Sequence, residues 1–407
     1  IEASGLDEDE CFIDYEKQYK CRMPLLEKAA FRGWKRDRAN VLQFTGENPW
    51  VEDYALFMAV KKHFNMLSWM EWPDEAIRMR DERAIRSYRR KLGPDIRFYT
   101  YLQYLFFRQW AALREYAHSK GVQIIGDLPI YVALDSADVW SESDNFQLDE
   151  ENFPVEVAGV PPDYFSSDGQ LWGNPLYDYS YMAKDGFGWW IRRIDRTGRL
   201  YDVIRIDHFR GFASYWAVPY GEETARNGRW VKGPGMSLIS VLKGWFPHLN
   251  FIAEDLGLPT PEVAELLSES GFPGMKVLEF AFDYREESAY LPHRYDHNCI
   301  CYTGTHDNDT VLGWKKNADR EEVRKARRYL GLNSREGFVW GMVRGGMSST
   351  ADVFIAQIQD YLELDETARI NVPRTLGGNW KWRMLPGQLS DKLASRLHKL
   401  TALYGRL

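Results

Sequence analysis

Cysteine is scarce in this chain of 407 residues, which contains only four. They are Cys11, Cys21, Cys299 and Cys301. Their spacing matches neither a disulfide framework nor the paired Cys-x-x-Cys pattern of a structural zinc site. Because unpaired cysteines are typical of reducing compartments, we expect a cytoplasmic protein.

Long hydrophobic runs are also absent. No stretch of about 18 apolar residues occurs, which argues against a membrane-spanning helix, and the first residues, IEASGLDEDE, lack the basic and apolar regions of a signal peptide. The formal net charge is −7, with acidic and basic residues interspersed. This pattern excludes the basic footprint of a protein that binds nucleic acid or an anionic membrane, so we expect a neutral or small substrate.

The short motifs of several enzyme classes are missing too. The sequence has no Gly-x-Ser-x-Gly elbow, no Gly-x-x-x-x-Gly-Lys-Ser/Thr loop, no Gly-x-Gly-x-x-Gly after an apolar run and no His-Glu-x-x-His. His306, Asp307 and Asp309 offer metal-ligating atoms, but they share one segment without a further Cys or His partner. We therefore predict neither a metal nor a cofactor.

Aromatic residues, in contrast, are abundant. They make up 15% of the chain and include 16 Trp. Most are expected to pack in the core, but flat aromatic faces also bind the apolar faces of sugars. The chain length suits an α/β barrel with insertions.

The first part of the chain has a helical pattern. Apolar residues recur at three-to-four spacing in residues 15–31, 48–64 and 101–121. Gly121 is the expected stop of the last helix. We predict a mainly helical insertion over residues 1–118, followed by a catalytic (β/α) barrel over residues 119–407.

Short apolar runs then alternate with helical segments, which is typical of a parallel sheet covered on both faces. There are about six such runs, at residues 122–130, 201–209, 250–257, 275–282, 299–307 and 368–372. Residues 131–188, between the first two runs, are rich in Pro, Gly, Asp and aromatics. We expect them to form a long, irregular loop that serves the function of the protein, because loops of this length are usually functional.

Four of the runs end in charged residues. These are Asp127, then Arg205 with Asp207 and His208, then Glu254 with Asp255, and finally His306 with Asp307. Polar residues at the carboxyl ends of barrel strands point into the active site. A single acid at such a position is more often a helix N-cap or an anchor of the following loop than a catalyst, and we interpret Asp255 in this way.

For Asp207 and Glu254 the neighbouring residues favour a catalytic role over an N-cap. Arg205 lies two residues before Asp207 on the same face of the strand, where its charge favours an ionised carboxylate suited to nucleophilic attack. Glu254 follows Phe251, Ile252 and Ala253, and an apolar strand favours the protonated form that a general acid needs. Two carboxyls in opposite environments form the pattern of a glycosidase.

Five segments together resemble the 4-α-glucanotransferases known as amylomaltases or disproportionating enzymes, in the α-amylase clan. They are GDLPIYVALDSADVW (126–140), AGVPPDYFSSDGQLWGNPLY (158–177), RIDHFRGF (205–212), IAEDLG (252–257) and GTHDNDT (304–310). The segment 158–177 is the most specific of them. TLGGNWKWR (375–383) is also similar to the family.

The resemblance implies a (β/α)₈ barrel and a retaining double displacement that transfers α-1,4-glucan segments to glucose or maltooligosaccharide acceptors. It makes Asp207 the nucleophile, Glu254 the general acid/base and Asp307 the stabiliser of the transition state. It also implies substrate contacts for a second set of residues. These are Asp127, Arg205, His306 and Asn371, together with Tyr164, Phe165, Trp172 and Asn174 in the loop 131–188, which the resemblance implies to be a substrate-covering loop.

The family carries two barrel strands before the segment that this chain resembles, so we expect a barrel without its first two strands. Two other functions stay open at this stage. One is an α-amylase-like hydrolase that transfers only to water, and the other is a non-catalytic glucan-binding fragment. The aromatic loop could also serve packing alone.

Overall fold

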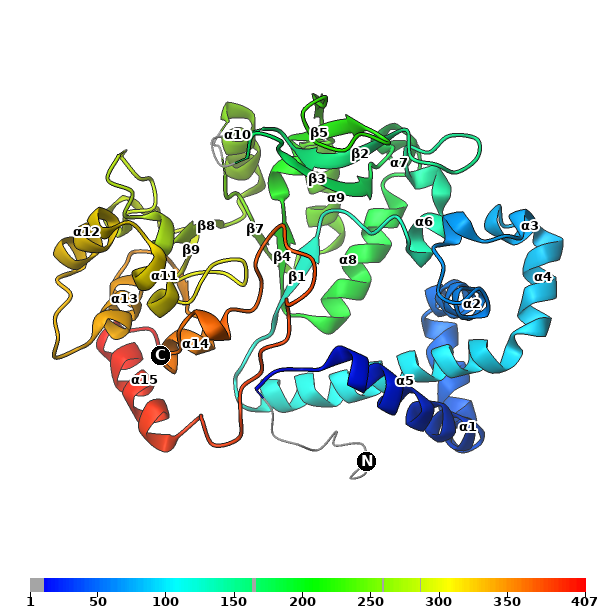
Figure 1. The fold of residues 1–407 in the computed structure, drawn as a ribbon, viewed down its shortest axis with the longest axis horizontal. Coiled ribbons are helices and arrows are strands. Elements are labelled where there is room, and N and C mark those ends of the chain that lie inside the picture. The colour runs from blue at the N-terminus through cyan, green and yellow to red at the C-terminus, as the bar shows by residue number, and fades with distance from the viewer. Residues whose placement is uncertain (1–10, 163–165, 258–259, 286) are drawn as a thin grey trace. The chain divides into compact units, whose positions relative to one another are not determined.

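The computed structural model describes residues 11–162, 166–257, 260–285 and 287–407. The chain forms two compact units, one of Pro24–Gly271 and one of Ile1–Met23 with Phe272–Leu407. Figure 1 traces the elements of both units.

Helices dominate the first part of the chain, as the sequence predicts. They are α1 (Tyr15–Glu47), α2 (Trp50–His63), α3 (Glu75–Arg78), α4 (Glu82–Lys91) and α5 (Gly93–Ser119). Asp81 begins α4, because its carboxylate accepts the N–H groups of Arg83 and Ala84. Gly121, at φ 70°, follows the end of α5 in the left-handed conformation that ends many helices, which confirms the predicted stop.

A parallel three-stranded sheet forms the centre of the unit Pro24–Gly271. Its strands lie in the order β1-β4-β7, with β1 (Ile125–Pro129), β4 (Val203–Asp207) and β7 (Asn250–Ala253). Helices separate the strands along the chain: α8 (Gly188–Leu200) precedes β4, α9 (Met236–Trp245) precedes β7, and α10 (Pro261–Ser270) follows β7. Ile204, Ile206 and Ala253 are fully buried, so the first three predicted strands are confirmed with shorter bounds.

The same unit contains an antiparallel sheet that the sequence analysis missed. Its order is β3-β2-β5-β6, with β2 (Glu156–Val160), β3 (Gln170–Pro175), β5 (Ser214–Pro219) and β6 (Arg229–Lys232). Residues 131–188 are thus not irregular throughout, since they hold β2, β3, α6 (Ala137–Ser141) and α7 (Tyr179–Lys184). The pairing of β2 with β5 joins segments distant in sequence, and local patterns do not reveal such contacts.

The second unit also has a parallel three-stranded sheet, in the order β10-β9-β8, with β8 (Gly274–Val277), β9 (Cys299–Tyr302) and β10 (Val353–Ile355). Its helices are α11 (Val311–Asn317), α12 (Arg320–Leu330), α13 (Phe338–Met347), α14 (Ile358–Tyr361) and α15 (Asp391–Leu403). All residues of α13 except Arg344 are buried, so this helix forms much of the core.

Two strand predictions in this unit need correction. The run 275–282 leaves the strand after Val277 and continues as the 3₁₀ helix η5 (Leu278–Phe280). The predicted strand 368–372 is wrong: Ala368 ends the 3₁₀ helix η7 (Glu366–Ala368), and the Arg369 side chain binds the carbonyl of Asn371. The third strand is instead β10, whose three residues are too short to give a periodic pattern.

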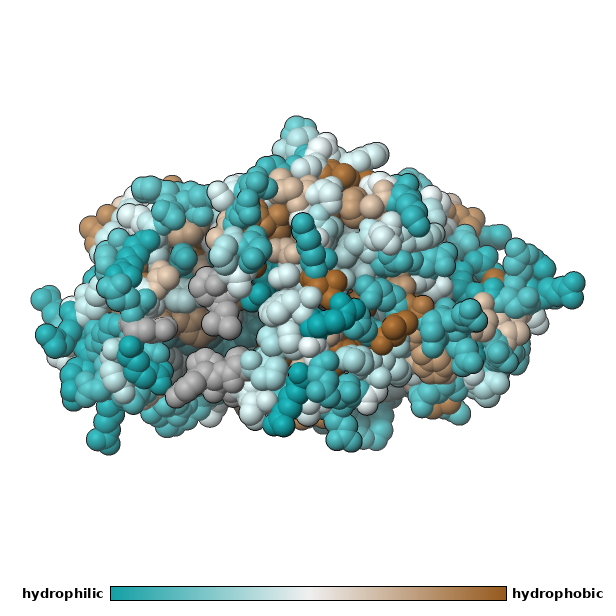
Figure 2. Space-filling view, turned by 90° about the horizontal axis from the view of Figure 1, so that it is seen from above, coloured by the Kyte–Doolittle hydropathy of each residue, from teal (hydrophilic) through white to brown (hydrophobic). Residues whose placement is uncertain are grey.

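The surface is mainly hydrophilic, as expected from a sequence without long apolar runs. Figure 2 shows a mainly hydrophilic face on which apolar residues form small separate patches. Among the residues that the structure describes, no helix is both long and apolar enough to cross a membrane.

Candidate active site

Four charged residues lie in the middle or at the carboxyl ends of the parallel strands β1, β4 and β7. Asp127 on β1 pairs in register with Arg205 on β4, and Asp207 is the last residue of β4. Glu254 directly follows β7, and its N–H donates to the carbonyl of Ile206 at 3.0 Å. Parallel strands bring these ends to one edge of the sheet, so the structure groups all four predicted residues.

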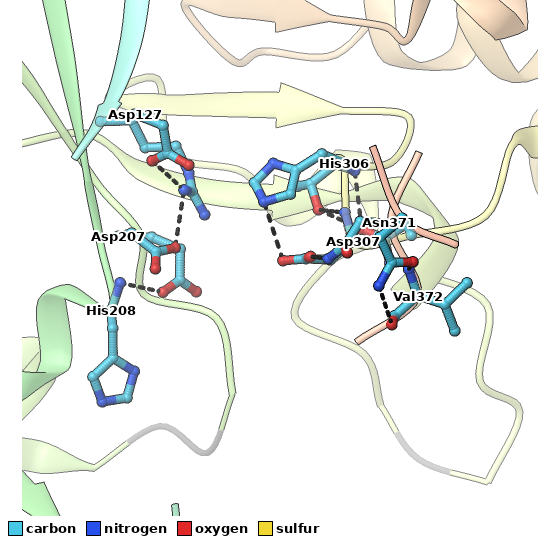
Figure 3. Close-up of polar contacts among 12 residues, drawn as sticks. Asp127, Asp207, His208, His306, Asp307, Asn371 and Val372 are labelled. Carbon is cyan, nitrogen blue, oxygen red and sulfur yellow. Dashed lines mark hydrogen bonds and ion pairs between the residues drawn. The ribbon is translucent and has the colours of Figure 1, made fainter. Parts of the chain in front are cut away.

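Arg205 links the two aspartates (Figure 3). Its Nη1 donates to Asp127 Oδ1 at 2.5 Å and to Asp207 Oδ1 at 3.0 Å. Burial acts to lower the pKa of Arg205, but the charges of Asp127, Asp207 and Glu254 outweigh burial and raise it. A fixed positive charge beside Asp207 stabilises its carboxylate and sets its orientation.

Glu254 lies in the opposite environment. Burial raises its pKa to about 7, and the charge of Asp207 adds to this effect, while Arg205 and two backbone N–H groups oppose it. His208 N–H donates to Oε2 at 2.8 Å and Leu256 N–H donates to Oε1 at 2.9 Å. The two bonds hold both oxygens in place, so Glu254 is an oriented carboxyl that exchanges a proton near neutral pH.

The antiparallel sheet contributes Trp172 and Asn174, both from β3. The indole of Trp172 meets the His208 ring edge to face, with centroids 4.7 Å apart, so Trp172 lies beside the residue that follows Asp207. Asn174 donates to the carbonyl of Val132 at 2.8 Å and thereby holds the chain that leaves β1. Tyr164 and Phe165, also predicted to contact substrate, lie outside the described residues.

His208 is a residue whose role the sequence analysis did not assign. It has φ 53°, a left-handed conformation that is uncommon for a residue other than glycine. Burial lowers the pKa of its imidazole to about 3, so the ring is neutral. The turn at His208 points its N–H at Glu254, which explains the unusual backbone.

In the second unit, His306, Asp307 and Asn371 form one group (Figure 3). Asn371 Nδ2 donates to Asp307 Oδ1 at 2.6 Å, and His306 Nε2 lies 3.4 Å from Asp307 Oδ2. Arg369 donates to the backbone carbonyls of both Asp307 and Asn371. The structure therefore brings together these three predicted residues and adds Arg369, which the sequence analysis did not single out.

Glu279 is a second residue that the sequence analysis missed. Its side chain is buried, with the residue 7% exposed, and its Oε1 has no hydrogen-bond partner among the residues that the structure describes. Burial, with the charges of Asp360 and Asp309, raises its pKa well above the ordinary value. A Cβ placed on Gly304 would lie 3.0 Å from this oxygen, so Glu279 lies directly beneath the segment that carries His306 and Asp307.

Glu279 should make stability depend on pH. Its pKa is raised in the folded state, so the native protein holds this proton more tightly, and the free energy of unfolding falls as pH rises above about 4.5, the ordinary value of Glu. The Tm of Glu279→Gln minus that of the unmodified chain is expected to increase between pH 5 and pH 8. Glu321→Gln, at a surface ion pair with Arg324, is the control. A Tm difference that does not change with pH would contradict this account.

The segment of His306, Asp307 and Asp309 carries three side chains with metal-ligating atoms. Within residues 11–162, 166–257, 260–285 and 287–407, no group of three or more His, Cys, Asp or Glu side chains is arranged to hold a metal ion. Asp309 instead binds the N–H of Thr310 and the amide of Asn317.

A buried acid that titrates near neutrality, next to a carboxylate held by arginine at the ends of adjacent strands, is typical of enzymes that act on glycosidic bonds. Comparison with known proteins makes the class more specific. The model of the family described as 4-alpha-glucanotransferase matches residues 2–389. A 4-alpha-glucanotransferase of Clostridium butyricum is 46% identical over 408 residues, which are 100% of this chain and 84% of that protein.

Two solved structures of amylomaltases are also similar to this chain. An amylomaltase from Streptococcus agalactiae, solved in complex with acarbose, matches with a TM-score of 0.95 and 41% identity over 98% of this chain and 81% of the other. The amylomaltase from Corynebacterium glutamicum, at 20% identity and a TM-score of 0.74 over 96% of this chain and 60% of that one, supports the α/β fold alone. The chain belongs to the 4-alpha-glucanotransferase family. The resemblance that its motifs show is thereby confirmed. The protein is an enzyme with glucanotransferase activity, and the alternative of a hydrolase is not favoured.

Proposed function

We propose that the enzyme transfers α-1,4-glucan segments to glucose or maltooligosaccharide acceptors by double displacement at Asp207. The observation that carries this proposal is the pair formed by the arginine-bound carboxylate of Asp207 and the buried carboxyl of Glu254. The acarbose complex of the relative from Streptococcus agalactiae supports a saccharide ligand.

The first step breaks the glycosidic bond. The Asp207 carboxylate attacks the anomeric carbon, and Glu254 donates its proton to the departing glycosidic oxygen, so a glycosyl ester forms and the shortened glucan leaves. Such a step requires the two carboxyls to lie roughly 5–5.5 Å apart. Arg205 supports it by fixing the direction of Asp207.

The second step is the reverse of the first, with an acceptor sugar in place of the glucan that has left. Glu254, now ionised, takes the proton from the 4-hydroxyl of an incoming sugar, whose oxygen attacks the anomeric carbon and releases Asp207. We propose that Asp307 stabilises the positive charge of the oxocarbenium-like transition state. We also propose that Asp127, His306 and Asn371 hold sugar hydroxyls; Tyr164, Phe165, Trp172 and Asn174 complete the proposed substrate contacts.

The direct test is incubation with maltotriose. Transfer yields a ladder of longer maltooligosaccharides together with glucose and maltose, whereas hydrolysis yields shorter products only. If longer products do not form, the proposal of transfer is wrong.

The activity should fall at high pH. Glu254 must be protonated in the first step, and its pKa is raised to about 7, so the acid form persists up to neutrality and is lost above it. We expect kcat/KM for maltotriose to fall about tenfold per pH unit once the pH is well above 7. The pH–rate profile from pH 5 to pH 9 measures this fall. A kcat/KM that stays constant up to pH 9 would mean that Glu254 is not the acid.

Trp172 should affect the choice between transfer and hydrolysis. Its ring lies beside His208 next to the carboxylate pair and is 37% exposed, so it offers an apolar face to a sugar acceptor and excludes water there. Trp172→Ala is expected to raise the ratio of hydrolysis to transfer several-fold while Tm changes little. Quantification of glucose and longer products gives the ratio. A loss of Tm with an unchanged ratio would assign Trp172 to packing.

We also propose that the parallel strands belong to a (β/α)₈ barrel, of which the described residues form six strands. The support is that both parallel sheets follow chain order, β1-β4-β7 and β8-β9-β10, with helices in most connections. In this proposal residues 1–118 are the helical insertion, residues 119–407 are the catalytic part, and residues 131–188 cover the substrate. A cytoplasmic location is part of the same proposal.

A further inference from the structure

A groove lies in the unit Pro24–Gly271, outside the residues assigned to catalysis. Its volume is about 1070 Å³, and it is lined by residues from the hairpin β5–β6 and from α10. Arg210, in the 3₁₀ helix η4 (Phe209–Phe212), also lines it. The groove is large enough for a chain of several sugar units.

Two tryptophans form one wall of the groove. Trp216 and Trp230 are cross-strand partners on β5 and β6, and their rings meet edge to face with centroids 5.3 Å apart. Trp216 is fixed in place, since its Nε1 donates to the carbonyl of Ala225 at 2.8 Å and a Cβ on Gly228 would lie only 2.2 Å from that nitrogen. Trp230 remains 46% exposed. Contact with the fixed Trp216 ring restrains Trp230 as well, and a restrained, partly exposed indole is a platform that costs little entropy when a ligand binds.

Arg210 connects this wall to the carboxylate pair. It lies three residues after Asp207, and its guanidinium carbon is 4.5 Å from the centre of the Trp230 ring. Burial lowers the pKa of Arg210, while the charges of Glu254 and Glu262 act in the opposite direction. One short segment, residues 207–210, therefore joins the nucleophile candidate to a residue that lines the groove.

The groove is also lined by charged residues of both signs, with Arg210 and Lys232 as the cations and three glutamates as the anions. Glu262, Glu265 and Glu269 line the groove from α10, where their spacing of three and four residues places them on one face of the helix. Their carboxylates accept hydrogen bonds from hydroxyl groups, and the Lys232 ammonium can donate to them. An aromatic platform in a groove that also carries hydrogen-bonding groups for hydroxyls matches a neutral polyhydroxyl chain.

We infer that this groove is a distal subsite for the α-1,4-glucan chain, with Trp230 as the platform on which a sugar ring stacks. The inference rests on the proposed function, because it takes the substrate of the carboxylate pair as its ligand. The subsite favours glucans long enough to reach both the groove and the carboxylates. Short substrates such as maltotriose occupy the neighbourhood of the carboxylates alone.

The test compares substrates of different length in the Trp230→Ala variant. The KM for maltoheptaose is expected to rise about tenfold relative to the KM for maltotriose, which is the size expected for loss of one aromatic contact. Trp230→Tyr retains a flat ring and should restore most of the preference for maltoheptaose. Tyr220→Ala is the matched control, because Tyr220 follows β5, is 47% exposed and does not line the groove.

The outcomes separate the possible explanations. If the ratio of the two KM values is unchanged in Trp230→Ala while Tm falls, the tryptophan pair only stabilises the hairpin and the inference is wrong. If Tyr220→Ala changes the ratio equally, the effect is not specific to the groove and the inference is also wrong. If the unmodified enzyme makes no longer products from maltotriose, the proposed function fails instead.

Discussion

Asp207→Asn lowers kcat/KM for transfer from maltotriose by about four to five orders of magnitude, as expected for loss of a nucleophile. The amide has nearly the same shape as the carboxylate but cannot attack the anomeric carbon. Arg205 keeps its bond to Asp127 in this variant, so the fold should persist. Initial rates of glucose release and thermal unfolding measure the two effects separately.

A surface aspartate provides the control for this variant. Asp195 pairs with Arg199 on the exposed side of α8, and Asp195→Asn should leave both rate and Tm near those of the unmodified enzyme. Substantial turnover by Asp207→Asn, within about tenfold of the unmodified enzyme, would exclude a covalent role for this residue.

Glu254→Gln is expected to lower kcat/KM for glucan donors by about three to four orders of magnitude, because the amide cannot protonate the departing oxygen. The defect should depend on the leaving group. Maltosyl fluoride releases fluoride without needing a proton, so formation of the glycosyl ester should recover with this donor. An equal loss of fluoride release and of maltotriose cleavage would show that Glu254 is not the acid.

The same substitution also has a structural cost. Glu254 accepts one backbone N–H on each of its two oxygens, from His208 and from Leu256. Glutamine has one acceptor oxygen, so its amide group would face one of these donors, at a cost of about 1–3 kcal/mol. Glu223→Gln, at an exposed carboxyl, serves as the control for stability.

The contrasting surroundings of Asp207 and Glu254 could be predicted from the sequence because they depend on residues that are close in the chain. Arg205 and Asp207 share one face of a strand through their spacing of two residues, and the apolar residues before Glu254 indicate its burial. The structure shows the expected ion pair between Arg205 and Asp207 and the expected burial of Glu254. Asp207 and Glu254 could thus be singled out before their neighbours were known, although their catalytic roles remain predictions.

Other features depend on contacts between distant segments and could not be predicted. The sheet β3-β2-β5-β6 joins β2 to β5, and β10 is too short to show a period. Glu279 follows an apolar run like many acids at strand ends, and only the three-dimensional structure reveals Asp360 and Asp309 beside it. The apolar residues of 368–372 alternate as in a strand, which led to the wrong prediction there. The structure has no strand in this segment, and the Arg369 side chain donates to the carbonyl of Asn371 instead.

The most direct test of the central claim is to trap the glycosyl intermediate. Glu254→Gln is mixed with maltosyl fluoride, quenched in acid, digested and analysed by mass spectrometry. The account predicts a burst of about one fluoride per enzyme and a maltosyl group attached to Asp207. An adduct on another residue, or a stoichiometric burst without any adduct, would contradict it.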